Sequence, residues 1–600
     1  MSMSMLRKVI PATLLVAGCL GAGLASAGPA DSHQHGLEEH ADSIRDRVTA
    51  ERQVHWRNPR AGAPKSWVRF KLLGINDFHG QLEPRLLGRR PAGGAAVLAS
   101  YLEAAAETAE DGAILVHAGD HVGASPPVSA LLQDEPSISF LNLLANRHCD
   151  YRFRLDPRCN LVGTLGNHEF DEGTDELLRL LDGGNHAEGP FLEDPWRGAR
   201  YPMVSANVVR ADTGEPLLPP SVVKRVRGIP VGFIGAVLKE TPTIVTPSGV
   251  AGLRFLDEAD AINAEAARLK RRGVHALVVA IHQGTLQTPS STEPTPAESV
   301  VLDGAIGEIV SRLDDEVDIV ISGHAHSFTN ALVENHNGVP ILVTQAFSAG
   351  TAYGDIEVAI DPATRDVVQK SARIVTTWGD EGPGLTPDPE VVELVAAAAQ
   401  TVAPLVNRVI GTAAGDITRT ESVAGESALG NFIADAQRTA MGTEIALMNP
   451  GGIRADIAAG EVTWGELFTV QPFNNDLVRM TLTGAQLIEL LDQQWSGQPF
   501  ARVMKTSGLS YTWNENGAGF ADNRVDPASI RVNGVLLNPA ANYSLTVNSF
   551  MASGGDNFTV LTQGTERTVG PVDLDALVNY VEGLTQPFSA AIEGRITTAP

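Results

Sequence analysis

Residues 161–171 read Leu161-Val-Gly-Thr-Leu-Gly166-Asn167-His168-Glu169-Phe170-Asp171, an apolar run that ends at a glycine and leads at once into polar side chains. A short apolar run bounded by glycines is typical of a buried strand. A polar side chain just past such a strand is held by a rigid scaffold and remains reachable. The first half of the chain repeats this arrangement after the apolar runs 68–75, 113–116, 276–281 and 317–321. These runs lead into Asp77-Phe78-His79, Gly119-Asp120, His282 and Gly323-His324-Ala325-His326.

The order of strand-like and helical patterns divides the chain into two units. Between residues 66 and 378, apolar runs alternate with helical patterns over 95–106, 175–181 and 259–271, which predicts an α/β domain. Residues 379–406 form a linker, in which a Gly- and Pro-rich break precedes an expected helix over 389–406 that kinks or ends near Pro404. Residues 407–600 form a second unit, with helices expected at 428–439 and 483–495 and strands at 445–448, 477–481 and 543–547.

The composition is that of an ordinary globular protein with an acidic surface. The chain has 43% hydrophobic and 19% charged residues and a formal net charge of −26. This charge argues against a general affinity for nucleic acid or for anionic lipid. It does not exclude an anionic substrate, because bound cations reverse the local field.

The N-terminus carries the pattern of a secretory signal peptide over residues 1–27. Arg7 and Lys8 precede an apolar stretch that ends at Ala25-Ser26-Ala27, an A-x-A cleavage site. The alternative is a lipoprotein-type cleavage at Val16-Ala17-Gly18-Cys19, which would leave a lipid anchor on Cys19. No other stretch predicts a transmembrane segment. We therefore expect a periplasmic or secreted protein, or one anchored by lipid to the cell surface, in which residues 28–65 form a tether.

Cys149 and Cys159 remain in the exported chain. Two cysteines close in sequence in an oxidising compartment favour a disulfide that closes a small loop, and two reduced thiols are the alternative.

The strand ends of the first unit carry side chains that suit divalent cations. Asp77 and His79 are two residues apart, so on an extended strand end they point to the same side. Asp120 can bridge two ions through its two oxygens, and Asn167 offers a neutral carbonyl. Imidazole nitrogens suit Zn, Mn or Fe, and they are offered by His282, His324 and His326. Two-cation sites of this kind hydrolyse phosphate esters.

His168 and Asp171 differ from these residues because their spacing places them on one helical turn. An aspartate can fix the tautomer of an imidazole and raise its basicity. The pair would protonate or stabilise a leaving oxygen. Other histidines are expected to be structural: His117, His121, His148, His186, His275 and His336.

Over residues 66–597 the chain resembles the secreted two-domain 5′-nucleotidase family. The resemblance rests on the motifs 74–80, 166–171 and 323–326. It implies a four-layer α/β/β/α metallophosphatase sandwich, joined by a helix to a C-terminal α+β nucleotide-binding domain that rotates relative to it. It also implies that Asp77, His79 and His326 bind one ion, that Asn167, His282 and His324 bind the other, that Asp120 bridges them, and that His168 and Asp171 are catalytic.

The second unit contains Gly-rich loops beside aromatic and charged residues. A Gly-Gly step before Arg454 lets backbone and guanidinium approach a phosphate together. Phe473 and Phe550 could stack on a base, and Asp556 could accept hydrogen bonds from ribose hydroxyls. The resemblance implies these roles and adds a base contact at Asn449. It also implies a further arginine that helps to hold the phosphate. This chain has Gly425 where some relatives have that arginine, and the nearest candidate is Arg419.

These features predict a hydrolase that uses two divalent cations and metal-activated water to convert nucleoside 5′-monophosphates to nucleoside and phosphate. Alternatives are a 2′,3′-cyclic-nucleotide phosphodiesterase with 3′-nucleotidase activity, a hydrolase of UDP-sugars or nucleotide pyrophosphates, and a non-catalytic nucleotide-binding surface protein. The aromatic pair disfavours the sulfur-linked substrates of some relatives. The sequence leaves the oligomeric state open.

Overall fold

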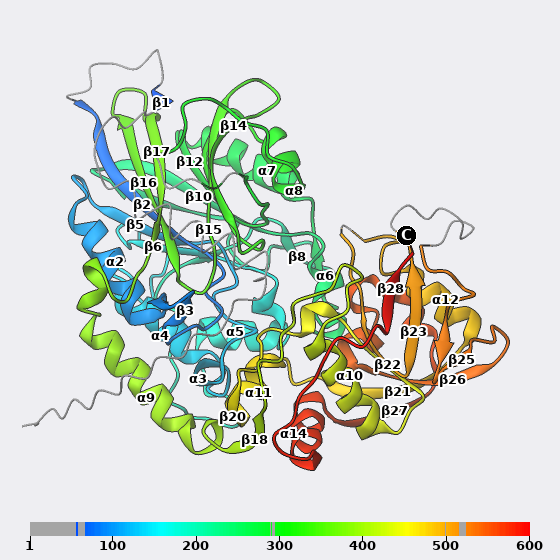
Figure 1. Ribbon diagram of the computed structural model, residues 1–600. Coiled ribbons are helices and arrows are strands. Elements are labelled where there is room, and N and C mark those ends of the chain that lie inside the picture. The colour runs from blue at the N-terminus through cyan, green and yellow to red at the C-terminus, as the bar shows by residue number, and fades with distance from the viewer. Residues whose placement is uncertain are drawn as a thin grey trace, which may run out of the picture.

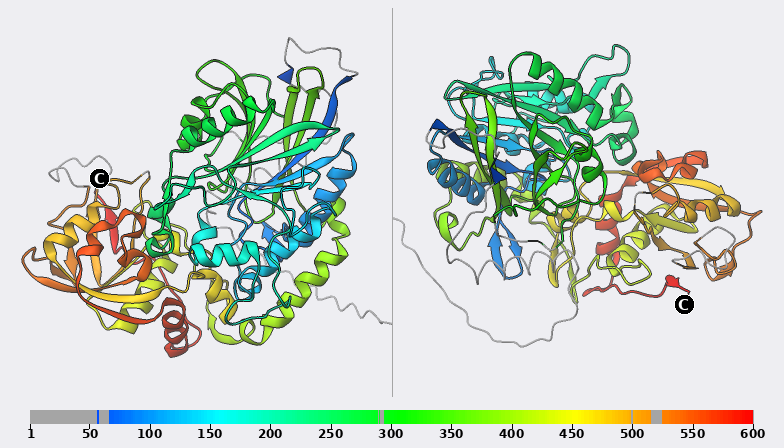
Figure 2. Two further views of the ribbon diagram at one scale, coloured as in Figure 1. Left: turned by 180° about the vertical axis from the view of Figure 1, so that it is seen from behind. Right: turned by 90° about the horizontal axis from the view of Figure 1, so that it is seen from above.

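The computed structural model describes residues 56–57, 66–288, 290, 294–498, 500–514 and 524–599. The expected signal peptide with Cys19, and all of the expected tether except Trp56–Arg57, lie outside these residues. Figures 1 and 2 show two domains side by side, one built from the chain up to α9 and the other from β18 onward.

Two sheets form the centre of the N-terminal domain. The first has the strand order β1-β17-β16-β2-β5-β6-β7, and the second has the order β14-β15-β13-β12-β10-β9. The strands of the first sheet are β1 (Trp56–Arg57), β17 (Asp366–Thr376), β16 (Ala352–Asp361), β2 (Val68–Ile75), β5 (Ala113–His117), β6 (Leu161–Thr164) and β7 (Met203–Val204). Those of the second are β14 (Phe328–Glu334), β15 (Pro340–Ala346), β13 (Val317–Ser322), β12 (Ala276–His282), β10 (Ile229–Val237) and β9 (Ser221–Val226).

Alternation along the strands explains the layers. Leu72 of β2 packs with Phe233 of β10 in the core between the sheets, whereas its neighbour Leu73 belongs to the core on the other face. Helices α2 (Ala95–Glu107), α4 (Glu135–Leu144) and α5 (Thr174–Asp182) contribute to that outer core. Helices α7 (Glu258–Arg271) and α8 (Ala305–Ser311) cover the outer face of the second sheet. The expected α/β/β/α order of layers is therefore confirmed.

Parallel pairing brings the ligand-bearing loops together. Strands β2, β5 and β6 are parallel neighbours, as are β10, β12 and β13. Carboxyl ends of parallel strands meet at one edge of a sheet, where ligands bind in many α/β folds. The polar motifs that follow β2, β5, β6, β12 and β13 all lie at these carboxyl ends.

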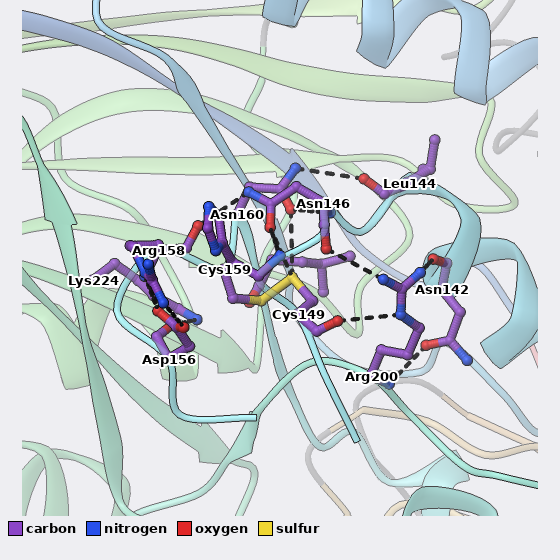
Figure 3. Close-up of a disulfide and its surroundings, with 12 residues drawn as sticks. Asn142, Leu144, Asn146, Cys149, Asp156, Arg158, Cys159, Asn160, Arg200 and Lys224 are labelled. Carbon is purple, nitrogen blue, oxygen red and sulfur yellow. Dashed lines mark hydrogen bonds and ion pairs between the residues drawn. A yellow bond between two sulfur atoms is a disulfide. The ribbon is translucent and has the colours of Figure 1, made fainter. Parts of the chain in front are cut away.

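A disulfide links Cys149 to Cys159 between α4 and β6, as predicted (Figure 3). The guanidinium of Arg200 holds the first half of this loop by donating to the carbonyls of Asn142, Asn146 and Cys149. The second half contacts β9, where Lys224 donates to the carbonyl of Asp156 at 3.3 Å.

Helix α9 (Pro389–Val406) connects the domains, and Pro404 lies inside its last turn. Its buried residues Val391, Ala398 and Val402 join the core of the N-terminal domain, beside α2 and α4. In the described part of the chain, α9 is the one helix long and apolar enough to cross a membrane by length and composition alone.

The C-terminal domain is α+β. Its five-stranded sheet has the order β22-β19-β26-β21-β27. The strands are β22 (Lys505–Ser507), β19 (Ile445–Met448), β26 (Asn542–Asn548), β21 (Asp476–Thr483) and β27 (Thr565–Val572), and the main helices are α10 (Ala428–Met441), α11 (Trp464–Val470), α12 (Gly484–Asp492) and α14 (Asp573–Gly583). Helix α12 begins one residue later than expected because Thr483 is its N-cap, in a capping box with Gln486. It also ends three residues earlier than expected. Strand β18 (Val409–Ala413) pairs with β20 (Gly460–Thr463) near the connector.

Candidate active site

Two groups of ligand-type side chains share one carboxylate. The first comprises Asp77, His79, Asp120 and His326, and the second comprises Asp120, His282 and His324. In each group, one ligand atom from every residue lies within 4.8 Å of the others. Asp120 belongs to both, which is the geometry of a bridging ligand. Side chains from four separate strand ends therefore meet in one place.

Within the first group, facing nitrogens and oxygens are close together. His79 Nε2 lies 3.0 Å from His326 Nε2, and His326 Nε2 lies 3.2 Å from Asp77 Oδ1. In the second group, His282 Nε2 lies 2.9 Å from Asp120 Oδ2. The side-chain oxygen of Asn167 lies 3.1 Å from His324 Nδ1, so Asn167 adjoins the second group.

The backbone at the ligands is left-handed. Asp77, His79, Asp120, His324 and His326 have φ between 48° and 73°. The expectation that Asp77 and His79 converge because they alternate on an extended strand is therefore wrong. Strand β2 ends at Ile75, and the two side chains are aimed by left-handed residues beyond it. Non-glycine residues in this region are uncommon and cluster at functional sites.

Hydrogen bonds behind the ligands fix which ring nitrogen faces the site. His79 Nδ1 bonds to the carbonyl of Gly123 at 2.9 Å, and His282 Nδ1 bonds to that of Ala118 at 2.8 Å. Both rings then present Nε2, as metal-ligating histidines do. His282 Nε2 is buried and faces the carboxylate of Asp120. This nitrogen therefore points at the carboxylate that both groups share, which fits a metal ligand.

Two glycines leave room for the ligands. A Cβ at position 166 would lie 2.1 Å from Asp120 Oδ1. A Cβ at position 323 would lie 3.0 Å from both Asp77 Oδ2 and His282 Nδ1. Any larger residue would displace these ligands, so the donor set and the space around it both fit two divalent cations.

Glu169 ties two ligand loops together, a role that the sequence analysis missed. Its buried carboxylate accepts backbone N–H bonds from Gly166, Asp120 and His121. The N–H of His168 in turn donates to Asp120 Oδ1 at 2.8 Å. The loop after β5 and the loop after β6 are thus joined through one side chain. The only sequence signal was its place between His168 and Asp171.

His168 and Asp171 form the expected pair. They flank a 3₁₀ turn, and His168 Nδ1 lies 2.7 Å from Asp171 Oδ2. Burial lowers the pKa of His168, but the Asp171 and Asp120 carboxylates raise it by more, so the pKa lies above its ordinary range. With Nδ1 engaged, Nε2 is the ring nitrogen available to a substrate.

One cavity of about 1540 Å³ is lined by both domains. The N-terminal domain contributes Asn167, His168, Asp171 and His324 to its wall. The C-terminal domain contributes the expected substrate residues Asn449, Arg454, Phe473, Phe550 and Asp556.

Phe473 and Arg454 reach the N-terminal side of this cavity. The Phe473 ring stacks on His168, with centroids 5.7 Å apart and planes inclined by 16°. The Arg454 guanidinium lies 5.9 Å from the centre of the Phe473 ring. The carboxylates of Asp120 and Asp171 act on Arg454 electrostatically. Arg454 therefore lies on the side of the cavity where Phe473 meets His168.

Arg419 lies elsewhere. Its Nη1 donates to the carbonyl of Arg454 at 3.1 Å, and its backbone N–H donates to Asp456. It does not belong to the described cavity wall. In this arrangement Arg419 supports the Arg454 backbone.

Asp556 is held by neighbours that include a second residue missed from the sequence. Asn449 Nδ2 donates to Asp556 Oδ2 at 2.9 Å. Arg502 Nη1 lies 3.5 Å from Asp556 Oδ1. No motif surrounds Arg502, and only the folded chain brings it to Asp556.

The comparisons with known proteins agree with this site. Residues 70–328 match the family described as calcineurin-like phosphoesterase, and residues 409–563 match the 5′-nucleotidase C-terminal domain. The chain is 37% identical over 551 residues to the endonuclease YhcR of Bacillus subtilis, covering 90% of this chain and 42% of YhcR. It is 34% identical over 559 residues to the cell wall protein Lmo0130 of Listeria monocytogenes, covering 87% of this chain and 68% of that protein.

A solved structure shares the whole architecture. The crystal structure of a 5′-nucleotidase precursor from Thermus thermophilus is 29% identical, with a TM-score of 0.71, and the match covers 88% of this chain and 99% of that one. The chain spans less than half the length of YhcR, so that protein's activity does not transfer directly. The motifs, the two matched domains and this likeness lead to one conclusion. The chain belongs to the 5′-nucleotidase family of metal-dependent phosphoester hydrolases, in which a calcineurin-like phosphoesterase domain precedes a 5′-nucleotidase C-terminal domain.

Proposed function

We propose that this protein is an exported 5′-nucleotidase that hydrolyses nucleoside 5′-monophosphates to nucleoside and inorganic phosphate. The observation that carries the proposal is the shared cavity, in which Phe473 of one domain stacks on His168 of the other. A substrate there would contact the proposed phosphate-binding residues of the N-terminal domain on one side and aromatic, nucleoside-binding residues of the C-terminal domain on the other.

The N-terminal domain would hold the phosphate. Asp77, His79 and His326 would bind one divalent cation, Asn167, His282 and His324 the other, and Asp120 both. The imidazole-rich set suits Zn²⁺ or Mn²⁺. When bound, two such cations polarise phosphoryl oxygens and supply activated water. Arg454 would neutralise the remaining phosphate charge, which a guanidinium does with paired hydrogen bonds.

His168 would donate a proton to the leaving group. Asp171 orients its ring through Nδ1 at 2.7 Å, which leaves Nε2 to donate to the 5′ oxygen of the departing nucleoside. The stacked Phe473 ring covers one face of this imidazole and limits its contact with water.

The C-terminal domain would select the nucleoside. Phe473 and Phe550 offer stacking surfaces for a base, and the Asp556 carboxylate offers acceptors for ribose hydroxyls. A phosphate monoester without a base would leave this half of the cavity unused. The N-terminal pattern of residues 1–27 supports export, with lipidation at Cys19 as the alternative anchor.

Phosphate release from AMP tests the proposal. The purified protein, loaded with Mn²⁺ or Zn²⁺, is expected to release phosphate from AMP, to stop when a chelator is added, and to recover when the cation is restored. Binding of AMP without release would indicate a non-catalytic nucleotide-binding protein. Release of phosphate from p-nitrophenyl phosphate but from no nucleotide would rule out the nucleotidase.

Phosphodiester hydrolysis is the second candidate. The cavity exceeds the usual range of about 300–1,000 Å³ for small-molecule sites, and a relative at 37% identity is named an endonuclease. Assays with 2′,3′-cyclic AMP, a UDP-sugar and bis(p-nitrophenyl) phosphate, run beside AMP, separate these activities by their kcat/KM values.

A further inference from the structure

Arg502 lies in the substrate cavity at a point where the proposed reaction does not use it. Its side chain is 10% exposed and that of Asp556 is 11% exposed. Arg502 Nη1 donates to Gln498 Oε1 at 2.9 Å and lies 3.5 Å from Asp556 Oδ1. A guanidinium carries five N–H donors, so these two contacts leave donors for a ligand.

The second arginine of the cavity is placed differently. Within the described wall, Arg454 and Arg502 are the arginines, and no lysine accompanies them. The Arg454 guanidinium lies 5.9 Å from the centre of the Phe473 ring, which stacks on His168. Arg502 instead pairs with Asp556. The cavity therefore has one fixed positive charge on the side of His168 and another beside the residue proposed to hold the ribose.

Gln498 fixes Arg502 in this position. Its Nε2 donates to the backbone carbonyl of Asp556 at 2.6 Å while its Oε1 accepts from Arg502. Asn449 holds the other oxygen of the Asp556 carboxylate, and Asn548 donates to Asn449 at 3.0 Å. This buried network organises Arg502 before any ligand arrives, and preorganised donors bind more tightly.

We propose that Arg502 is a specificity residue for nucleotides that carry a second phosphate on the 2′ or 3′ oxygen of the ribose. The inference rests on the proposed function, because it takes Asp556 as the ribose contact. A phosphate on either oxygen would bring negative charge beside the Asp556 carboxylate. A cation in the same place makes that arrangement favourable, and Arg502 supplies it.

Two kinds of substrate share this chemistry. One is a nucleoside 3′,5′-bisphosphate, and the other is the 5′-phosphorylated end of an oligonucleotide. In the reaction on adenosine 3′,5′-bisphosphate, water adds to the 5′ phosphorus and the bond from phosphorus to the 5′ oxygen breaks. The products are adenosine 3′-phosphate, whose 5′ oxygen takes a proton, and inorganic phosphate.

The test is the ratio of kcat/KM for adenosine 3′,5′-bisphosphate to that for AMP, measured on the metal-loaded full chain. The wild type is expected to favour the bisphosphate by about 10-fold or more, because a charge-assisted hydrogen bond is gained. Arg502→Met is expected to lower the ratio by about 10- to 100-fold. Arg502→Lys should lie between the two, because it keeps the charge and loses the fork of donors.

Arg531→Met is the matched control. Arg531 is exposed on β24 (Arg531–Val532), outside the cavity, and its replacement is expected to leave the ratio unchanged. Metal content and turnover of p-nitrophenyl phosphate are measured for every variant, so that a damaged metal site is recognised. An unchanged ratio in Arg502→Met overturns the proposal. A change confined to the ratio of kcat/KM for GMP to that for AMP also overturns it, because Arg502 would then contact the base.

Two further arms complete the experiment. A 5′-phosphorylated diadenylate distinguishes the bisphosphate from an oligonucleotide end as the substrate. If Arg502→Met also lowers kcat/KM for the diadenylate, the proposal extends to chain ends. If the wild type hydrolyses no nucleotide, the proposed function fails. Calorimetric affinities for AMP and the bisphosphate then still decide the inference, which is overturned if Arg502→Met leaves their ratio unchanged.

Discussion

The imidazole of His168 lies under the ring of Phe473, with centroids 5.7 Å apart, although the two residues belong to different domains. The same imidazole is bonded to Asp171 through Nδ1. A residue of the domain proposed to select the nucleoside thus contacts the residue proposed to complete the chemistry. The two domains must stay close for this contact to persist.

His168→Ala should lower kcat on AMP by about 10²-fold or more, because the leaving oxygen loses its proton donor. The metal content, measured by elemental analysis, should remain that of the wild type. Asp171→Asn is expected to have a smaller effect, since the ring keeps a neighbour but loses a charge. Full activity in His168→Ala would remove this pair from the mechanism.

Asp120→Asn should reduce metal content and activity together. The amide keeps the shape of the side chain but offers one neutral oxygen in place of the shared carboxylate. Elemental analysis and AMP turnover are to be measured on the same preparation. Retained occupancy of both metals would show that Asp120 does not bridge.

Glu169→Gln should weaken metal binding by about 10- to 100-fold, the usual cost of losing an outer-shell partner. The amide can accept fewer of the three N–H bonds that join the loops of Asp120 and Gly166. A metal titration followed by activity measures the change. Glu172→Gln, on the same loop, is the matched control, and an equal effect there would discount the loop linkage.

Phe550→Ala should raise KM for AMP by about 10-fold, since a stacked base contributes about 1–3 kcal/mol. Its effect on p-nitrophenyl phosphate should be much smaller. Phe473→Ala should impair both substrates, because it also uncovers His168. Equal losses on both substrates in Phe550→Ala would make that residue structural.

Asp573, the first residue of α14, should make stability depend on pH. Burial raises the pKa of this carboxyl to about 7. Because the folded state then binds a proton more tightly than the unfolded state, the free energy of unfolding should fall as pH rises from the ordinary aspartate range to about 7.

Asp573→Asn should remove that slope and stabilise the protein at pH 8 by about 2–4 kcal/mol. Urea unfolding from pH 4.5 to 8 measures this. The exposed Asp575→Asn is the control, and an unchanged slope in Asp573→Asn would refute the assignment.

The strands and the metal ligands could be predicted from the sequence because they rest on local pattern. Val68–Ile75 alternates apolar with basic residues before the run Leu72–Ile75, and β2 has these bounds. The ligands follow such runs directly. The left-handed backbone at Asp77 and His324 could not be predicted, because it depends on loops that the whole fold shapes. The one indication in the sequence is that Asp and His occur in the left-handed backbone conformation more often than most residues do.

Glu169 and Arg502 show where sequence reasoning stops. Glu169 acts through bonds to backbone N–H groups of Asp120 and Gly166, and such bonds leave no spacing pattern. Arg502 gains its meaning from Asp556, which a different segment supplies. For Arg419, the sequence offered nearness to a motif, and the structure instead directs its side chain to the Arg454 backbone.

The left-handed ligands also restrict what protein engineering can do at this site. A designer who wishes to change the preferred metal would replace His324 or His326, whose φ values are 73° and 50°. Valine, isoleucine and threonine are poor choices whatever their chemistry, because β-branched residues tolerate such φ values badly. Asn, Asp and Gly fit this backbone most readily, and of these Asn and Asp can still coordinate a metal, so Asn and Asp are the first replacements to choose at either position.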